Sequence, residues 1–538
     1  MSGWIKEEKD LKEITVHAAA GEFGKAFDFI EKELQRSRIS RQIISENMIV
    51  FEAIFNDIIL KGFPEETQVK ISIKNSFGNP GIKLEFPGER YIPIGGDSLE
   101  DSVEYKIIKA YEDKLEYTYR ASYNIIRLTV KRDYATQAVL CAAGFLLAAG
   151  VYAVISHTVS PESREHLLRS AVMPAENIFT NAMLMIGTPM TFFSILKNLL
   201  ETYIISERSS SARRLQGKTL ITSATAVLLA VVLGFGVKLF SPYVTGLFGH
   251  YSFNIYTDAD LSELVSSIMP SGIFEPFNMI SPFPLIIIAL LIVYALRSAG
   301  SQFDKLKSAV DACYMLFSRM LNLVMFFLPF FSFLAFLHIL LERGFVCLKG
   351  VLFCWVAVLI GIVFLMLIYA LRLKLGGIKI INFIRNITPI LKENIKINSS
   401  IDAVPFNIRQ CAKLLGIDRN YLEDALPVLA QINLDGNCFI IMEITMVMLI
   451  STGTVLPWWN YLILAVLVIF LSLGAPNQPG SILIGVLIIV NYLNAPSMMA
   501  VAIYAEVLLG MAQCFVNVTG DIVMVAIESR KAEKKLKE

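Results

Sequence analysis

The chain has 538 residues, of which 55% are apolar and only 18% are charged, and its mean hydropathy is +0.57. Because a soluble domain carries about 25% charged residues, this composition excludes an ordinary soluble protein and indicates long segments in lipid. The 48 basic and 47 acidic residues leave a net charge of +1, so no nucleic-acid partner is expected. The seven cysteines include no C-x-x-C pair, so we expect neither a disulfide framework nor a zinc site.

Charged residues are frequent in residues 1–133 and sparse afterwards, so we expect a soluble head before a membrane body. The chain begins MSGWIKEEKD, which is too charged for the apolar region of a signal peptide. We therefore expect the head to stay in the cytoplasm. Alternation of apolar residues predicts strands, and helical periodicity predicts helices, in an α/β sandwich. The expected strands are 68–74, 81–86 and 123–130, and the expected helices are 22–36, 40–61 and 99–112.

The expected helix 40–61 contains Glu52-Ala-x-x-Asn56, which resembles the N-box of the histidine-kinase-like ATPase fold, especially of anti-sigma regulatory kinases. The resemblance implies that Asn56 helps to hold Mg²⁺ and that a later Asp-x-Gly-x-Gly contacts adenine. Only Phe86-Pro-Gly-Glu-Arg90 stands in that region, so we expect the fold without efficient ATP hydrolysis. The alternative is that Glu52 and Asn56 form one turn of a solvated amphipathic helix.

Six apolar windows are long enough to cross a membrane, which takes about 20 residues in a helix. They lie near 136–156, 176–200, 219–241, 279–297, 318–341 and 347–371. Beyond Lys396 a polar stretch is followed by runs near 425–453, 459–473, 481–493 and 498–527. Two of these runs are short, and Ser472-Leu-Gly-Ala-Pro-Asn-Gln-Pro-Gly-Ser481 separates them. Short interrupted segments of this kind indicate a transporter binding site.

Basic residues are concentrated in alternate loops between the expected spans, which predicts a cytoplasmic head and tail. They are Lys131, Arg132, Arg208, Arg213, Arg214, Lys218, Arg297, Lys305, Lys307, Arg372, Lys374, Lys379 and the tail 530–538. The intervening loops 157–175 and 242–273 hold few basic residues. We therefore expect a multi-pass protein of the cytoplasmic membrane, in contact with membrane lipid.

Three carboxylates, Asp402, Asp435 and Asp521, fall within or beside the later apolar runs. Ionisable residues in a membrane are costly and indicate function, because an isolated carboxylate there must take a proton or bind a cation. Nearby Asn, Thr and Ser oxygens suit a hard monovalent cation. Gly436 and Gly520, each beside an Asp, would allow the backbone to leave the helical conformation. The alternative is that Asp435 and Asp521 are protonated or paired structural groups.

Four motifs occur in the order and at the spacing of the dicarboxylate/amino acid:cation symporter family, which includes the glutamate transporters. They are Ser399-Ser400…Pro405, Asn433-Leu-Asp-Gly436, Ser472-Leu-Gly-Ala-Pro-Asn-Gln-Pro-Gly480 and Asn517-Val-Thr-Gly-Asp521. The resemblance covers roughly 136–529. It implies eight transmembrane helices and two re-entrant hairpins in inverted repeats, with hairpin one near 381–412 and hairpin two near 459–492. It also implies a homotrimer, in which spans one, two, four and five form a scaffold for a mobile transport unit. We accordingly divide the chain into a head (1–133), a membrane domain (134–529) and a basic tail (530–538).

The resemblance implies sodium sites at Asp435 and Asp521. One site aligns with Thr222, Ser223, Asn433 and Asp435, and a second with Asn433, Asn517 and Asp521. A third uses backbone carbonyls near Gln431, Ser472 and Leu473. Retention of both carboxylates and of the Thr-Ser pair favours Na⁺ over H⁺ coupling.

The family's solute site aligns with positions at the two hairpin tips and on the seventh and eighth spans. These positions are Ser399, Ser400, Asn437, Ala475, Gly480, Gly510, Gln513, Cys514 and Asn517. Gln513 stands where members that carry acidic solutes have an Arg, and Gly510 stands where amino-acid transporters have an Asp. We therefore expect a polar solute that is neutral or singly charged, unless Asp402 or Glu506 compensates.

The sequence as a whole predicts a sodium-coupled symporter of elevator type with a regulatory head that contacts a cytoplasmic protein, and not an enzyme. The alternative is a membrane solute sensor that signals through its head.

Overall fold

The computed structural model describes residues 12–37, 39, 41–76, 79–91, 108, 115–130, 134–238, 269–279, 282–453, 456–476, 479–495 and 499–537. The chain forms two compact units, Met1–Thr136 and Gln137–Glu538.

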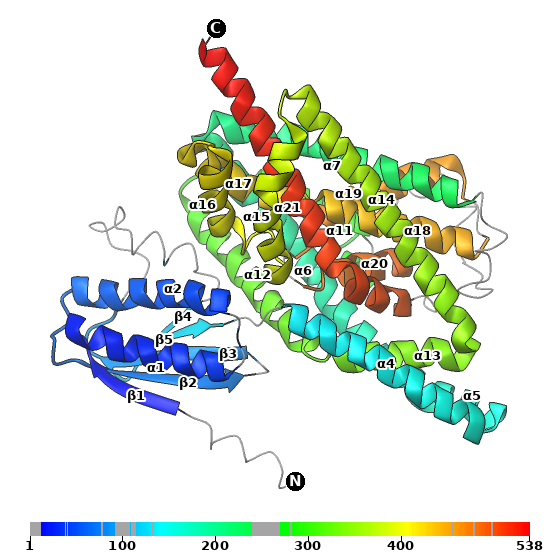
Figure 1. Cartoon of the computed structure of the whole chain (residues 1–538), viewed down its shortest axis with the longest axis horizontal. Coiled ribbons are helices and arrows are strands. Elements are labelled where there is room, and N and C mark those ends of the chain that lie inside the picture. The colour runs from blue at the N-terminus through cyan, green and yellow to red at the C-terminus, as the bar shows by residue number, and fades with distance from the viewer. Residues whose placement is uncertain are drawn as a thin grey trace. The chain divides into compact units, whose positions relative to one another are not determined.

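Within its described residues, the first unit has two layers, a sheet of five antiparallel strands and a layer formed by the α-helices α1 and α2 (Figure 1). The strands are β1 (Lys12–His17), β2 (Gln68–Ser76), β3 (Asn79–Pro87), β4 (Leu115–Arg120) and β5 (Tyr123–Thr129), in the order β1-β2-β3-β5-β4. The helices are α1 (Phe23–Arg36) and α2 (Arg41–Leu60). Cross-strand partners Ile71, Leu84 and Ile126 are all buried, which places one face of the sheet against the helices.

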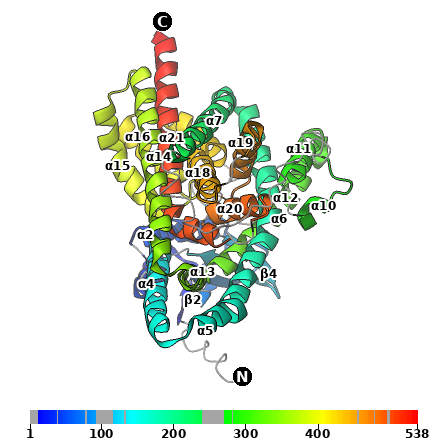
Figure 2. The same cartoon turned by 90° about the vertical axis from the view of Figure 1, so that its right-hand side faces the viewer.

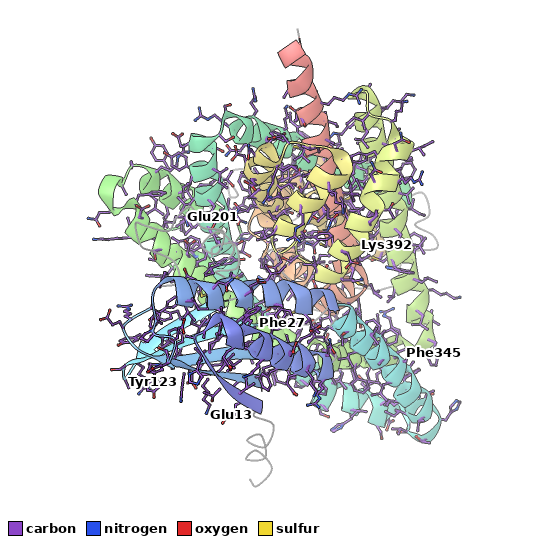
Figure 3. All side chains as sticks on the ribbon, turned by 60° about the vertical axis from the view of Figure 1, so that its left-hand side comes forward. Glu13, Phe27, Tyr123, Glu201, Phe345 and Lys392 are labelled. Carbon is purple, nitrogen blue, oxygen red and sulfur yellow. The ribbon has the colours of Figure 1, made fainter. Side chains whose placement is uncertain are left out.

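The strands predicted at 68–74, 81–86 and 123–130 correspond to β2, β3 and β5. Strand β1 was not predicted, although Ile14 and Val16 alternate with Glu13, Thr15 and His17, because this six-residue segment contains only two apolar residues. The helix predicted at 99–112 lies outside the described residues except for Ile108. Phe27 on α1 and Tyr123 at the start of β5 mark the helical layer and the sheet in Figure 3.

The second unit consists of helices and the turns between them in its described part. Its first helices are α4 (Tyr134–Thr158), α5 (Pro161–Leu167), α6 (Met173–Arg208), α7 (Ser210–Lys238), α10 (Glu275–Met279), α11 (Pro282–Arg297), α12 (Phe303–Met325), α13 (Leu328–Arg343) and α14 (Cys347–Leu375). The later helices are α15 (Ile380–Ile397), α16 (Val404–Leu415), α17 (Arg419–Ile432), α18 (Asp435–Ser451), α19 (Trp458–Leu473), α20 (Ser481–Tyr492) and α21 (Met499–Lys537). A π-helical turn, Leu168–Val172, joins α5 to α6.

Seven segments within the described residues are helical, long and apolar enough to cross a membrane, by length and composition. The segment Arg419–Ser451, which contains α17 and α18, has its most apolar stretch wholly buried, whereas α4 and α14 bury only 22% of theirs. The α17–α18 segment therefore lies in the interior of the unit, whereas α4 and α14 lie at its surface.

Several predicted spans differ in detail from the observed helices. Span 279–297 corresponds to the 16-residue helix α11, and span 318–341 is divided between α12 and α13 at Phe326 and Phe327. Those two residues are as apolar as their neighbours, so hydropathy does not reveal the break. Helix α21 continues into the predicted basic tail 530–538, as far as Lys537.

Two pairs of short helices occupy the positions predicted for the hairpins. Helices α15 and α16 are joined at Asn398, which has a left-handed φ of +51°. Helix α20 follows Gly480, whose φ of +103° is a conformation that favours glycine. The observed bounds, 380–415 and 458–492, enclose the predicted 381–412 and 459–492.

Candidate functional site

The helix break between α17 and α18 is the centre of the candidate site. Asn433 and Leu434 lie outside both helices, and α7 and α21 pack beside the break (Figures 1 and 2). A break in a buried helix frees backbone polar groups that need partners. Asn517 on α21 accepts a hydrogen bond from the backbone N–H of Gly436, and hydroxyls on α7 donate to the side chains of Asn433 and Asp435.

Gly436 and Gly520 allow these helices to approach closely. A Cβ at Gly436 would lie 2.6 Å from the carbonyl oxygen of Gln513, and one at Gly520 would lie 2.9 Å from the hydroxyl of Tyr369. The expectation that both glycines loosen the helix is wrong: α21 remains helical through Gly520, and Gly436 lies within α18. Their role is close packing, and the backbone leaves the helix at Asn433.

Asp435 is fully buried at the start of α18. Its Oδ2 accepts a 2.7 Å hydrogen bond from the hydroxyl of Tyr369 on α14, and its Oδ1 accepts a 3.3 Å bond from Ser223 on α7. No salt bridge to Asp435 is found within the described part of the chain. Arg372 lies one turn from Tyr369, with its guanidinium 5.9 Å from the ring centroid. A basic residue therefore stands in the neighbourhood, which the local sequence of Asp435 did not indicate.

Asp521 is the second buried carboxylate, and Asn433 connects it to α7. The amide of Asn433 donates to Asp521 Oδ1 at 2.8 Å, and its Oδ1 accepts from Thr222 Oγ1 at 2.8 Å. Thr222, Asn433 and Asp521 thus form a chain of contacts from α7 through the break to α21. All three are at least nine-tenths buried.

Asn517 lies one turn before Asp521 and binds the first turn of α18. Its Oδ1 accepts from the backbone N–H of Gly436 at 2.7 Å, and its amide donates to Asn437 Oδ1 at 3.1 Å. The structure therefore brings Asn517 to the break, where it contacts Gly436 and Asn437.

The oxygen atoms at the break are of the kinds that bind a hard cation. The side chains that meet at the break have two carboxylates, one carboxamide oxygen and two hydroxyl oxygens, and they come from α7, α18, α21 and from Asn433 in the break itself. Oxygen ligands are preferred by hard cations, and broken helices supply such sites in transporters. When a cation such as Na⁺ is bound, these residues would hold it and it would neutralise the carboxylates.

The positions predicted for a third cation site lie beside α6. Gln431 Nε2 donates to Glu201 Oε2 at 2.5 Å, and the carbonyl of Leu473 accepts from Asn198 at 2.9 Å. Glu201 is labelled on α6 in Figure 3. The hydroxyl of Ser472 is buried without a hydrogen-bond partner among the described residues. A cavity of about 510 Å³ reaches Ser472 from between α6 and α7.

The positions predicted for the solute gather at the two helix pairs and on α21. Ser481 Oγ donates to Gln513 Oε1 at 2.8 Å, and Cys514 Sγ lies 3.6 Å from the carbonyl of Asn394 on α15. Ser399 and Ser400 are buried at the α15–α16 turn, and Ser400 neighbours Cys514. Both helix pairs therefore meet the same stretch of α21.

The model of the sodium:dicarboxylate symporter family matches residues 140–531. The chain belongs to this family. Similar curated proteins include the L-cystine uptake proteins TcyP of Bacillus cereus (strain ATCC 14579), 24% identical, and of Bacillus thuringiensis (strain Al Hakam) and Bacillus anthracis, each 25% identical. Each match extends over 246 residues, which is 44% of this chain and 51% of the relative. The chain thus spans about half the length of the curated relatives it matches.

The sodium:dicarboxylate symporter family is a family of transporters rather than of enzymes, and the seven described helices that are long and apolar enough to cross a membrane agree with a multi-pass membrane protein. Membership of the family also confirms the resemblance on which the motifs at Asn433, Asp435, Asn517 and Asp521 were interpreted. The individual roles of these residues remain predictions.

Four residues at the site were missed or left open by sequence reasoning. Tyr369 contacts Asp435, Asn198 and Glu201 contact the predicted third site, and Glu506 contacts the α19–α20 pair. A tyrosine in an apolar helix is common, so the sequence around Tyr369 did not mark it as a site residue. Asn198 and Glu201 lie one turn apart in α6, and two polar residues on one face of an apolar helix could have indicated that they belong to the site.

The N-box positions of the head show no closed nucleotide site in the described structure. Glu52 is exposed on α2, and Asn56 is half-buried one turn later. The neighbouring Asp57 is buried and accepts a 2.5 Å hydrogen bond from the hydroxyl of Tyr91. Desolvation and this carboxylate raise the pKa of Tyr91. Asp57 therefore binds Tyr91 within the core of the head, whereas Glu52 faces solvent.

Proposed function

We propose that the protein is a sodium-coupled symporter of a small polar organic solute. The observation that carries this proposal is the pair of buried carboxylates, Asp435 and Asp521, bridged by hydroxyl and carboxamide groups at a helix break. Two carboxylates without a salt bridge are costly in lipid. Na⁺ binding offsets that cost, and the inward Na⁺ gradient supplies the energy for solute uptake.

The proposed sodium sites follow the family alignment. One comprises Thr222, Ser223, Asn433 and Asp435, and the second comprises Asn433, Asn517 and Asp521. The third uses the backbone near Gln431, Ser472 and Leu473, where the 510 Å³ cavity gives access.

The proposed mechanism is an elevator movement within a homotrimer in the cytoplasmic membrane. The α15–α16 and α19–α20 pairs are the two re-entrant hairpins, and they move with α7, α14, α17, α18 and α21. The head and the end of α21 are cytoplasmic, because the basic loops are on that side. A regulatory protein in the cytoplasm is the proposed partner of the head.

L-Cystine is the first solute to test, because the similar Bacillus proteins are named for its uptake. Its two carboxylates are accompanied by two ammonium groups of its own, so it brings no net charge to a site that has Gln513 and Gly510 in place of charged residues. The test is L-cystine uptake by the purified protein in proteoliposomes, with and without an inward Na⁺ gradient. Uptake that is the same with and without the gradient would exclude sodium coupling.

A solute sensor is the second candidate. The observation that favours it is the separate head unit, which has its own buried core and precedes the membrane unit in the same chain. A sensor would bind solute in the presence of Na⁺ without moving it. Binding measured by thermal shift, together with absence of flux in the same proteoliposomes, would favour the sensor over the symporter.

We expect the head to fold without appreciable ATP hydrolysis, because no glycine-rich adenine motif follows Asn56. The measurement is phosphate release by a 1–133 fragment with ATP and Mg²⁺, alongside the Asn56→Ala variant. Activity that is robust in the fragment and lost in Asn56→Ala would contradict this expectation.

A further inference from the structure

A polar cavity of about 1030 Å³ lies between the start of α6 and the end of α13. Its walls come from α4, α5, the π-helical turn, α6 and α13, and the residues that line it belong to neither the proposed sodium sites nor the proposed solute site. Figures 1 and 2 show α5 at one end of the helical unit and the C-terminus of α21 at the other. In the orientation proposed above, the cavity is therefore on the outer side of the membrane.

The cavity lies where two membrane-capable segments meet the headgroup region. The segment Pro161–Glu207 begins at the cavity, and the segment Leu328–Val346 ends there. Pro174 lines the cavity, and Ile178 and Met185 continue the same face of α6 by one and by three turns. These two apolar side chains are 68% and 62% exposed. A polar cavity at the end of a span, continued by exposed apolar residues along the helix, has the form of a phospholipid site.

Arginine predominates among the charged residues that line the cavity. They are Arg164, Arg169, Arg343, Glu165 and Glu342. Three arginines and two glutamates give this set a formal charge of +1. Arg169 pairs with Glu165 at 2.8 Å, and Arg343 lies 3.9 Å from Glu342. Arg164 has no ion pair within the described part of the chain, so it carries the excess positive charge.

Arg164 also has a buried hydrogen-bond donor. Its Nε is buried and has no hydrogen-bond partner among the described residues. Buried donors are almost always hydrogen-bonded, so this N–H group indicates a ligand in the cavity beside it. His338, another residue of the lining, is already engaged, because its Nδ1 is 2.5 Å from Glu176 Oε2. The guanidinium of Arg164 is therefore the group that is available for an anion.

The wall of the cavity includes the π-helical turn Leu168–Val172. Such turns are rare, and they occur frequently at functional sites. Leu168 and Arg169 of this turn both line the cavity. The unusual backbone is thus found at the same place as the buried donor of Arg164.

We propose that this cavity binds the phosphate of an anionic phospholipid of the outer leaflet, with Arg164 as its ligand. A guanidinium binds a phosphate through two parallel hydrogen bonds. The lining has one excess positive charge, which matches a phosphodiester with one negative charge. Phosphatidylglycerol presents that charge alone, whereas phosphatidylcholine adds an ammonium group that an excess of arginine does not favour. Ile178 and Met185 contact an acyl chain.

The test measures stabilisation of the full-length protein, purified in detergent and depleted of lipid. Its unfolding temperature is recorded over a concentration series of dioleoyl-phosphatidylglycerol in detergent. Parallel series use dioleoyl-phosphatidylcholine and glycerophosphoglycerol, which is the soluble headgroup without acyl chains. The same measurements are made on Arg164→Ala, Arg164→Lys and Asn177→Glu. Asn177 lines the cavity and is exposed, so Asn177→Glu adds a negative charge there without removing a described side-chain contact.

We expect the phosphatidylglycerol concentration that gives half of the maximal shift to rise at least tenfold in Arg164→Ala and in Asn177→Glu. Arg164→Lys should give a smaller rise, because it keeps the charge but not the paired N–H groups. Arg419→Ala is the matched control, since Arg419 is an exposed arginine that pairs with Glu423 and lies outside the cavity lining. That variant should respond as the parent does. Phosphatidylcholine should stabilise the parent less than phosphatidylglycerol, and glycerophosphoglycerol should give no shift at the same concentrations.

Three results would overturn the proposal. The first is a response to phosphatidylglycerol that is the same in Arg164→Ala and Asn177→Glu as in the parent. The second is equal stabilisation by phosphatidylcholine, which would mean that the cavity does not select an anion. The third is an equal shift with glycerophosphoglycerol, which would indicate a site for a soluble phosphate rather than for a lipid. If Arg164→Ala does not fold, Asn177→Glu still decides the outcome, and none of these measurements requires transport.

Discussion

Asp435→Asn and Asp521→Asn are each expected to remove most of the stabilisation that Na⁺ gives the protein. Each change deletes the negative charge of a proposed site whose other ligands are neutral. These ligands are Thr222, Ser223 and Asn433 in the Asp435 site, and Asn433 and Asn517 in the Asp521 site. Loss of one partner of a buried charge pair costs about 3–5 kcal/mol. Because 1.4 kcal/mol corresponds to a tenfold change in affinity, Na⁺ should bind at least about a hundredfold more weakly.

The measurement is the unfolding temperature of the purified protein with increasing NaCl, at constant ionic strength set by choline chloride. A ligand at 100 times its dissociation constant stabilises by about 2.7 kcal/mol. At the same concentration, a hundredfold weaker site contributes only about 0.4 kcal/mol. The Na⁺-dependent shift of the variants should therefore nearly vanish.

The matched control is Glu443→Gln, because Glu443 lies on the same helix as Asp435 and is equally buried. It should keep the full Na⁺-dependent shift. A shift that persists unchanged in both Asp435→Asn and Asp521→Asn would remove the basis for the sodium assignment. A shift lost in all three variants would indicate a general effect of buried carboxylates.

The carboxylates of the candidate site were identifiable from sequence because charge is rare in apolar segments. Asp435 and Asp521 are exceptions to their surroundings, and each is followed or preceded by a glycine that the helix packing requires. Their partners were harder to identify. Tyr369 is 66 residues from Asp435 in the chain, and nothing in its own helix distinguishes it from an ordinary interfacial tyrosine.

The fold was predictable where hydropathy changes sharply and not where it stays uniform. The short runs around Ser472–Gly480 predicted the α19–α20 pair, because the turn is rich in Gly and Pro. The break at Phe326 and Phe327 lies in a continuous apolar run, so its position is seen only in the three-dimensional structure and not in the hydropathy. The cap of α20 by Glu506 is likewise a contact between helices that local patterns do not encode.

Aspartate, glutamate and succinate are expected to bind orders of magnitude more weakly than the solute the protein carries. A carboxylate that the solute's own ammonium groups do not balance needs a cation of the protein in a buried site, and Arg is suited to bind it through two hydrogen bonds. Gln513 offers only an amide, and its Oε1 already accepts a hydrogen bond from Ser481. Its remaining N–H groups neutralise no charge.

Glu506 strengthens this expectation. The sequence left open whether it compensates for the missing charged residues near Gly510. In the structure it caps α20 and brings a carboxylate to the tip, which opposes an anionic solute and favours a group that carries positive charge. A buried and unpaired solute charge costs several kcal/mol, so the discrimination should exceed about a hundredfold.

The experiment compares uptake of radiolabelled aspartate, glutamate and succinate under a Na⁺ gradient in the parent protein and in Gln513→Arg. The parent should show no saturable uptake at micromolar concentration, and such uptake of any of the three would defeat the prediction. Gln513→Arg should create succinate uptake, because its guanidinium can bind a carboxylate of the solute through two hydrogen bonds. Gln513→Lys is the matched control: it adds the same charge without the planar geometry and should restore less uptake. Gln513→Arg with Glu506→Gln should exceed Gln513→Arg alone, because the combined variant also removes the opposing carboxylate from the tip.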